Sequence, residues 1–504
     1  MSTISTLDFR VQNVTNFINS LYGEDGVNSS YVFIGKPTPW ADENRPPQPK
    51  NNLVDFFGAY QQMLSMRRIL GNECYPMFRR ITWRSGTTFD IYRHDYTSEN
   101  PAFTGAFKLE DATYYCITSK NVVYVCLDNS NNRPSIVEPQ NDNYEPFFTS
   151  DGYQWLKLFS IDSQVLNDFS TLRYLPLTSD GANLDVQPRV GGEITTVLID
   201  NAGNDYTISP GGVSNEVPAY YCRIVGDGDG AVASVRILPP STNDPELGTG
   251  IGAVRVVRGG SGYTYATLDF TPGRCYSSLS ELDENINGLD PRGDGTFQTT
   301  VIINPPNGWG HDLGRQLSAT TAGVFSSFNY SLSDFFTDTT FRQIGILQNP
   351  ETNEGIPDSP NTLSGCFAYR IVEIEGQTDF IIGENIYQQR YNEELQRSQT
   401  ARGRIVGWDQ GERVLRYIQI PEEHVDSDGV LYQFDSSTFI HGETSKKVVE
   451  PTSYNGSLAG LVFVNGFADT EVKRYSGNML YLSNISPVLR QPTQTERISL
   501  LIQF

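Results

Sequence analysis

Glycines cluster at three places where a ligand-binding loop would need them, and at two of these they lie beside aspartates. Residues 248–253 (GTGIGA) resemble a dinucleotide-binding turn in their letters, but that turn must open a helix whose N-terminus meets the pyrophosphate. The β-branched residues at 254–257 favour a strand instead, so we predict a hairpin loop. Residues 227–230 and 290–295 place carboxylates beside glycines, but calcium needs about six to eight oxygen ligands and neither stretch has a closing glutamate. We predict turns at both.

Histidine, serine and acidic residues, which serve in metal sites and in catalysis, do not occur here in the spacing that those sites require. Metal-ligand spacing and the H-E-x-x-H pattern are absent among the four histidines, which are His94, His311, His424 and His441. No G-x-S-x-G nucleophile elbow occurs. With 59 acidic residues, some carboxylates will lie in pairs by chance. A catalytic pair of the glycosidase kind is therefore an open alternative, although the sequence singles out no pair. We therefore predict no catalytic residue, no metal site and no cofactor.

Composition indicates a β-rich chain of several domains. At 504 residues the chain is too long for one core, and its length suggests about three domains. Tyr and Phe number 27 each and Gly 45, which is typical of strands and turns. The balance of 37 basic and 59 acidic residues gives a net charge of −22. This charge argues against nucleic acid and anionic membranes as partners.

Targeting and redox signals point to synthesis in a reducing cytoplasm. No apolar run approaches the roughly 18 residues of a membrane helix, and the first residues lack the pattern of a secretion signal. Six cysteines are scattered without a C-x-x-C motif, which indicates free thiols. Cys116 and Cys126 could face each other across a hairpin near Asn121, although the compartment disfavours a disulfide there.

Two helices are expected near the start of the chain. The first covers residues 5–21, with an apolar stripe and a capping box from Ser5 and Asp8. A proline-rich linker follows at 36–50. The second helix is predicted over 53–69, with residues such as Leu53, Phe57 and Tyr60 on one face that we assign to core packing.

Residues 151–159 (DGYQWLKLF) form the most distinctive strand signal in the chain, and we take it as the centre of the predicted strands. Asp-Gly is a turn signal, and the aromatic and apolar residues after it favour a buried strand. Strands are also predicted at 113–117 and 122–127. Residues 197–207 recur as 254–264 at an offset of 57, and each copy is a short strand, a glycine-containing turn and Tyr-Thr.

A second small module is expected nearer the C-terminus. Residues 380–384 (FIIGE) recur as 439–443 (FIHGE), and strands are predicted at 403–408 and 414–418. A barrel-like β domain would accommodate them. The chain then ends in two more predicted strands, at 479–482 and 498–504, the last tied into a sheet.

Several of these stretches, in the same order along the chain, resemble the baseplate wedge subunit of T-even-type contractile-tailed phages, the family usually called gene product eight. They lie at both chain ends and in the central scaffold: 16–20 (NFINS), 33–40 (FIGKPTPW), 79–83 (RRITW), 151–159, 341–346 with 349–350, 477–481 (GNMLY), and 493–498 with the terminal Phe504. The chain departs from the family in its greater length. The modules at 190–271 and 374–450 have no counterpart there.

The resemblance implies a mostly β, multidomain fold. We expect a β-sandwich and barrel scaffold with a few N-terminal helices, and the repeats in the sequence add two inserted small β modules. The resemblance implies a structural role without enzymatic activity, as a homodimer in each of the six wedges around the tail hub. It also implies contacts with the other wedge proteins, namely the inner ring-forming wedge dimer and the peripheral wedge proteins. The virion tail baseplate would be its location, after assembly in the host cytoplasm. The corresponding division is 1–189 (scaffold), 190–271 (repeat module), 272–373 (scaffold), 374–450 (barrel-like module) and 451–504 (C-terminal strands).

Arg79, Arg80 and Trp83 are the predicted partner interface, because Arg and Trp are enriched at interface hot spots. The alternative is that both arginines make internal links and Trp83 packs in the core. A competing function is glycan binding or glycan cleavage by a tail-associated protein, since aromatic rings and carboxylates on a β scaffold suit sugars. A capsid or neck protein is a third possibility.

Overall fold

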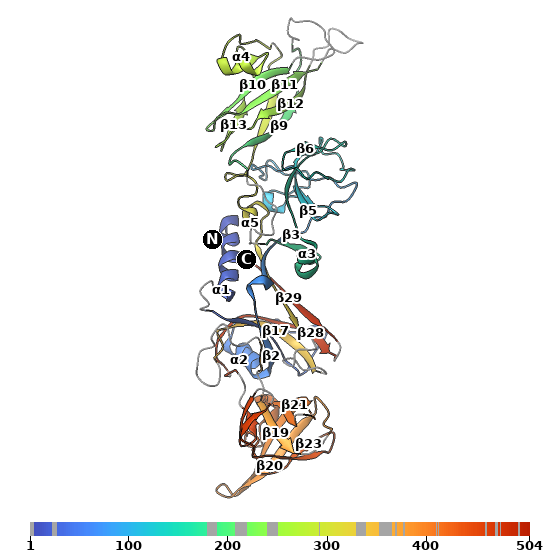
Figure 1. The fold of residues 1–504 in the computed structure, drawn as a ribbon, viewed down its shortest axis with the longest axis vertical. Coiled ribbons are helices and arrows are strands. Elements are labelled where there is room, and N and C mark those ends of the chain that lie inside the picture. Colours follow the sequence, from blue (N-terminus) through green and yellow to red (C-terminus); the bar gives the residue numbers. More distant parts are fainter. Residues whose placement is uncertain are drawn as a thin grey trace. The chain divides into compact units, whose positions relative to one another are not determined.

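The computed structural model describes residues 5–22, 28–178, 189–206, 219–238, 250–291, 293–328, 339–351, 365–367, 370–375, 379–409, 411, 413–458, 461–468, 472–473, 475–491 and 494–504. The chain forms two compact units: unit 1 (Met1–Val14, Tyr75–Thr321 and Gln503–Phe504) and unit 2 (Thr15–Cys74 and Ala322–Ile502). Strands dominate the described parts of both units (Figure 1). The predicted mostly β, multidomain fold class is confirmed.

Helix α1 (Leu7–Tyr22) confirms the first predicted helix. Its apolar stripe is buried at Val11, Val14, Ile18 and Leu21. The expected capping pair of Ser5 and Asp8 is wrong in detail, because the Thr6 hydroxyl accepts the N–H of Phe9 at 3.3 Å. Thr is an equally suitable cap residue, and its position one residue later fits the observed start of the helix.

The first core of unit 1 is a four-stranded antiparallel sheet in the order β4-β5-β7-β6, and strand β3 pairs with β8. The predicted strands at 113–117 and 122–127 are confirmed as β4 and β5. The elements are β3 (Cys74–Arg79), η2 (Leu109–Asp111), β4 (Tyr115–Ile117), β5 (Val122–Asp128), β6 (Phe147–Phe148), β7 (Gln154–Ser160), α3 (Ser163–Phe169) and β8 (Tyr174–Pro176).

The turn and strand at 151–159 form as predicted. The Asp151 carboxylate accepts the N–H groups of Ile136 and Val137, both at 2.9 Å, and thereby fixes the preceding loop. Gly152 has φ 89°, and a Cβ there would lie 2.5 Å from the Ser130 hydroxyl oxygen, so only glycine fits. Strand β7 then buries five consecutive residues, as expected of a central strand.

The rest of unit 1 is a barrel-like module (green in Figure 1). Strand β9 pairs with β15, while β12, β11, β10 and β13 follow one another in a second sheet. The elements are β9 (Ile194–Asn201), β10 (Ala219–Gly226), β11 (Val232–Ile237), β12 (Ile251–Arg258), β13 (Ala266–Leu268), β14 (Cys275–Tyr276), α4 (Leu279–Glu284) and β15 (Gln298–Ile303). Helix α5 (Leu313–Gln316) follows, and its Leu313 packs in the first core.

The predicted repeat is a structural repeat with local twofold symmetry. Strands β9 and β12 begin at Ile194 and Ile251, which is the offset of 57. Each donates its first N–H across to the other copy, Ile194 to the Gly259 carbonyl and Ile251 to the Ala202 carbonyl, both at 2.9 Å. Equivalent positions also agree in conformation and burial: Gly203 and Gly260 (φ 60° and 62°), and Tyr206 and Tyr263 (both buried).

This module continues past the predicted boundary at 271. Strand β14 pairs with β10, and β15 pairs with β9, so residues 275–303 complete the core of the repeat. The division of the chain into five segments as a whole stays a prediction.

Unit 2 is built on a five-stranded sheet in the order β18-β2-β1-β17-β28, and strand β29 pairs with β16. The predicted C-terminal strands are confirmed as β28 and β29. At their junction Arg490 and Glu496 form a buried ion pair at 2.7 Å. The elements are β1 (Ser30–Gly35), α2 (Leu53–Gln62), β2 (Met63–Arg68), η1 (Gly71–Glu73), β16 (Thr321–Phe328), β17 (Thr339–Gln348), β18 (Gly365–Phe367), β28 (Asn478–Arg490) and β29 (Glu496–Gln503).

The second predicted helix is wrong in its C-terminal half. Helix α2 ends at Gln62, and the chain turns at Met63 into β2, which pairs with both β1 and β18. A short apolar run buried between two strands cannot be distinguished from a buried helix by its periodicity. The assignment of the helical stripe to core packing is also wrong in part, because Leu53 is 70% exposed and Phe57 45% exposed.

The predicted barrel-like module is present in unit 2 (orange in Figure 1). Strands β19, β22, β21, β20, β23 and β24 form a closed ring, because β19 pairs with both β22 and β24. Its elements are β19 (Arg370–Glu375), β20 (Asn385–Asn392), β21 (Arg397–Asp409), β22 (Val414–Ile418), α6 (Pro421–His424), β23 (Ile440–Gly442), β24 (Val448–Pro451), β25 (Gly456–Leu458), β26 (Leu461–Val464) and β27 (Phe467–Ala468).

The apparent repeat of 380–384 in 439–443 is not a structural repeat. The first copy is a turn in which Gly383 has φ 88°, whereas the second copy contains strand β23. Glu384 is buried and accepts the N–H groups of Thr444 and Ser445, while Glu443 pairs with Arg402 in a partly exposed position. The two glutamates therefore serve different purposes despite the matching letters.

The cysteines whose side chains the structure describes are free thiols. Cys116 lies opposite Tyr124 in the β4–β5 register, so Cys126 is displaced along the ladder and no bridge forms. Among the described residues, no helix is long and apolar enough to cross a membrane.

Candidate interaction surfaces

Arg79, the first residue of the predicted interface, binds within its own unit. It ends strand β3, and its guanidinium donates to the carbonyls of Asp111 at 3.1 Å and Ala112 at 2.6 Å. The Tyr115 hydroxyl donates to the Arg79 carbonyl at 2.7 Å. Arg79 thus ties the segment before β4 to the end of β3.

Arg80 and Trp83 also bond internally. Arg80 donates to the Thr171 carbonyl at 3.3 Å, and the Trp83 indole N–H donates to the Ser135 hydroxyl at 3.1 Å. Trp83 is half-buried against an aromatic core. These contacts match the internal alternative, with carbonyls in place of the expected salt links. A partner interface at these three residues stays a prediction.

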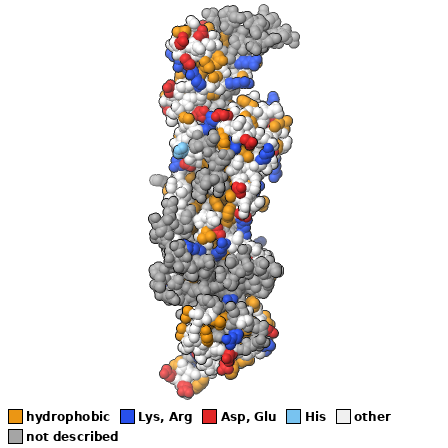
Figure 2. All heavy atoms as spheres, viewed as in Figure 1, with side chains coloured by type: hydrophobic (Ala, Val, Ile, Leu, Met, Phe, Trp, Pro, Cys, Tyr) orange, Lys and Arg blue, Asp and Glu red, His pale blue; other side chains and the backbone are white. Residues whose placement is uncertain are grey.

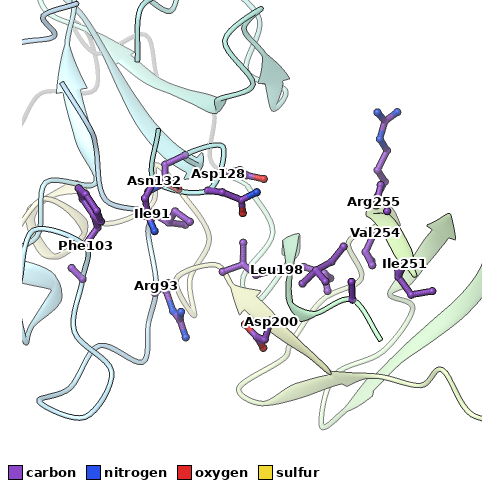
Figure 3. A pocket seen from close by; sticks show the side chains of 18 of the residues that line it. Ile91, Arg93, Phe103, Asp128, Asn132, Leu198, Asp200, Ile251, Val254 and Arg255 are labelled. Carbon is purple, nitrogen blue, oxygen red and sulfur yellow. The ribbon is translucent and has the colours of Figure 1, made fainter. Parts of the chain in front are cut away.

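A groove in unit 1 brings together residues that are far apart in the sequence (Figure 3). Its volume is about 710 Å³, and it lies between two loops of the first core and strands β9 and β12 of the repeat module. One side carries Ile91, Arg93 and Asn132, and the other carries Leu198 and Asp200. No residue of the groove was predicted as a site.

Asp90 holds the loop that carries Phe103 through hydrogen bonds. This fully buried carboxylate accepts four hydrogen bonds, from the N–H and hydroxyl of Thr104 and from the N–H and hydroxyl of Thr113, at 2.6 to 3.0 Å. Thr104 follows Phe103, which lines the groove with a side chain that is 58% exposed. Asp90 is therefore a positioning residue for that ring.

Asn129 organises the other loop. Its side chain is buried, donates to the Phe89 carbonyl at 2.9 Å and accepts the N–H of Asn132 at 2.9 Å. The three residues from Ser130 to Asn132 all have φ between 55° and 60°, a left-handed conformation that Asn tolerates better than most residues. This run turns polar side chains toward the groove.

Charges of both signs line the groove. Arg93 forms a two-pronged pair with Asp95, at 2.9 and 3.0 Å, which raises the pKa of the guanidinium, and Asp200 raises it further. Burial raises the pKa of Asp128, which also receives the N–H of Ser130. Acidic and basic side chains are interspersed in the same way on the described surface in Figure 2.

The groove can therefore form hydrogen bonds through carboxylates, amides and a guanidinium, beside the exposed rings of Phe103 and Phe148. Among the described residues, no group of three or more His, Cys, Asp or Glu side chains is placed to hold a metal ion. The Asn-rich loop at 129–143 was visible in the sequence as polar. Nothing marked Asp90, because its partners are 14 and 23 residues away.

Comparisons with known proteins were made for the whole chain. No model of a known protein family matches it, and no curated protein matches it.

Proposed function

We propose that this chain is a structural subunit of the baseplate wedge of a contractile-tailed phage, acting through shape and mating surfaces. As a homodimer it would link the inner ring-forming wedge dimer to the peripheral wedge proteins and take part in tail assembly and contraction. The observation that carries the proposal is the resemblance of stretches in the same order along the chain. A structural subunit needs surfaces that pair in one geometry, or in two when the tail contracts.

The positions of those stretches in unit 2 support the proposal. The stretch at 33–40 contributes to β1, 341–346 to β17 and 477–481 to β28, and these three strands are neighbours in one sheet. Ile34 lies opposite Ile344, and Tyr481 opposite Ile346. Segments more than 300 residues apart therefore form one scaffold, as a shared fold would require.

The parts without a counterpart in the family also support the proposal. The repeat module of unit 1 and the ring of strands in unit 2 each have a separate hydrophobic core. Such self-contained modules can be added to a scaffold without disturbing its sheet, and they would supply additional contact surfaces.

Cryo-electron reconstruction of the tail tip of the phage that encodes this chain tests the proposal. We expect density for both modules in the baseplate, with two copies in every wedge. Sedimentation of the purified chain should show a dimer. A sixfold tail plate with no density for this chain would contradict the assignment.

Glycan binding is a second candidate function, and the groove of Figure 3 favours it. Exposed aromatic rings can stack on the apolar faces of sugars, while planar groups such as those of Arg93 and Asn132 are suited to hydroxyls. A screen of the purified chain against host envelope polysaccharides would detect such binding.

The matched variants for this screen are Phe103→Ala in the groove and Leu172→Ala, an apolar residue that is 95% exposed and outside the groove. If the groove binds a glycan, Phe103→Ala should lower the affinity about tenfold or more while Leu172→Ala leaves it unchanged. Equal affinity in both variants would count against this function.

A further inference from the structure

A second groove lies in unit 2, separate from the one in Figure 3. Helix α2, the segment at 36–50 and strand β28 enclose a volume of about 510 Å³. Gly58 and Ala59 of α2 line one side, and Trp40 and Leu482 line others. Val54 at the edge is 78% exposed, so the groove is bordered by apolar surface open to solvent.

Gly58 has no internal reason to be glycine. It lies inside the ten-residue helix α2, where glycine is less favourable than alanine. Its φ is not positive, and a Cβ at this position would meet nothing within 4 Å. Neither backbone conformation nor packing within the chain therefore requires it. The consequence of glycine here is an open stretch of helix backbone facing the groove.

The walls of the groove are fixed before any ligand arrives. The Trp40 indole N–H donates to the Ile485 carbonyl at 3.1 Å, and the Asn484 amide donates to the Pro47 carbonyl at 2.8 Å. These bonds hold the proline-rich segment along strand β28. A preformed site loses little conformational freedom on binding, which favours affinity.

Two features of the groove walls bear on which ligand would fit: a fixed pair of side-chain amides, and the charge. Gln343 is 6% exposed, and its amide nitrogen donates to Asn484 at 2.8 Å, whose own donation to Pro47 fixes the orientation of both amides. Within the described part of the chain, the Gln343 side-chain oxygen accepts no hydrogen bond. This oxygen has almost no exposed surface, so Gln343 forms part of a fixed polar wall and does not bond a ligand itself.

Charge is the other feature. Lys36 and Lys50 line the groove, and Lys36 lies over the Trp40 ring and donates to the Thr38 hydroxyl. Asp55 is the acidic residue of the lining, and it already accepts the backbone N–H of Lys50 at 2.7 Å. The groove thus has an excess of basic side chains in a chain whose net charge is −22.

We propose that this groove binds an extended segment of a partner polypeptide. The segment places an apolar side chain over Gly58 and an acidic side chain near the two lysines. The two lysines favour an acidic segment by charge complementarity. Because Gly58 has no side chain, the segment can approach the backbone of α2 closely. This assignment goes beyond the proposed function and does not depend on it, because a peptide-binding groove can be tested outside any particle.

The test uses the full chain and dye-labelled octapeptides that carry one leucine and one glutamate at every relative spacing, with matched peptides that carry lysine in place of glutamate. Fluorescence anisotropy measures affinity. We expect a subset of the glutamate peptides to bind, with the matched lysine peptides about tenfold weaker or more. No binding by any glutamate peptide would overturn the proposal.

Three variants locate the binding. Gly58→Leu should weaken it about tenfold or more without lowering the unfolding temperature, since leucine favours the helix. Lys50→Glu should reverse the preference between glutamate and lysine peptides. Asn19→Leu, an exposed position on α1 outside the groove, should bind as the wild type does. Unchanged binding by Gly58→Leu, or a dimer that this variant alone dissociates, would overturn the assignment to a separate partner.

Discussion

At the scale of single residues, His424 shows how burial sets a dependence on pH. Its Nδ1 accepts the N–H of Ile420 at 2.7 Å, so Nε2 carries the proton, and the side chain is buried. Burial, with a smaller effect of the nearby Arg404 and Arg402, lowers the pKa of His424 to about 4. The folded state therefore remains neutral at a pH where the unfolded chain is already protonated.

The resulting prediction concerns local stability in acid. Because the folded pKa is depressed, the free energy of unfolding should fall as pH drops from about 6.5 to 4, by up to about 1.4 kcal/mol per pH unit. His424→Asn keeps an acceptor for Ile420 and removes this titration. Hydrogen exchange of strands β20 to β22 in the full chain, corrected for intrinsic rates, should lose the dependence between pH 6.5 and 5 in the variant. The same dependence in both proteins would exclude His424 as its source.

Asp90 supports a second prediction at this scale. Replacing it by alanine removes the buried acceptor of four hydrogen bonds from Thr104, which is exposed, and Thr113, which is half-buried, so we expect a loss of about 2 kcal/mol or more. Asp111→Ala, at an exposed aspartate of the same unit, should change stability by less than about 0.5 kcal/mol. Urea unfolding followed by fluorescence measures both. Similar midpoints for the two variants would show that the four bonds contribute little.

At the scale of elements, the β10–β14 ladder places Cys222 and Cys275 directly opposite each other, with the sulfur atoms 3.4 Å apart. Directly opposed residues of an antiparallel pair lie within the Cα distance that a disulfide spans. The contact between the two thiols and their burial raise the pKa of Cys222, so oxidation of the folded protein should be slow.

We predict that refolding in glutathione disulfide joins these two cysteines. Two exchange steps would transfer two electrons to the oxidant, form the sulfur–sulfur bond and release two molecules of glutathione. Because the two cysteines are 53 positions apart in the sequence, the bridge should stabilise the module by up to about 4 kcal/mol. Peptide mapping should find this link and none between Cys116 and Cys126. Cys222→Ser is the control, and two free thiols after refolding would contradict the prediction.

Helices and strands were predictable from the sequence where the local residue pattern and the packing against distant segments favour the same structure. The 57-residue repeat could be read because the same turn glycines and buried tyrosines recur in both copies, Gly203 with Gly260 and Tyr206 with Tyr263. Prediction failed at 63–68, where partners from β1 and β18 decide between helix and strand. It failed again at 380–384, where the burial of Glu384 by a distant loop decides the conformation.

At the scale of the whole molecule, neither groove was predictable from the sequence. The groove of Figure 3 joins loops at 91–103 and 128–132 to strands β9 and β12, and nothing local records that these segments meet. The predicted trio of Arg79, Arg80 and Trp83 was chosen by residue type alone, and all three residues bond internally. Residue type indicates what a side chain can do, while its place in the fold decides whether a partner can reach it.

The module in unit 2 allows a prediction about independent folding. Its ring of six strands closes through pairing of β19 with β22, and its core contains Val372, Ile374 and Leu415. A fragment covering 370–468 should therefore fold alone, with a cooperative thermal transition and dispersed amide resonances. A fragment covering 374–450 is the matched control. It lacks residues 370–373 of β19, which pair with β22, and strands β25 to β27, so the ring cannot close, and we expect it to be unfolded.

The complementary deletion tests the same boundary in the full chain. Removal of 370–468 should leave a soluble protein, because the described strands of the five-stranded sheet lie outside that range. Removal of 374–450 takes away β22 and leaves residues 370–373 of β19 without their partner on that edge, and exposed strand edges promote aggregation. We therefore expect the longer deletion to be the more soluble one, as measured by sedimentation of clarified lysates. The reverse order would mean that the ring and the sheet depend on each other for folding.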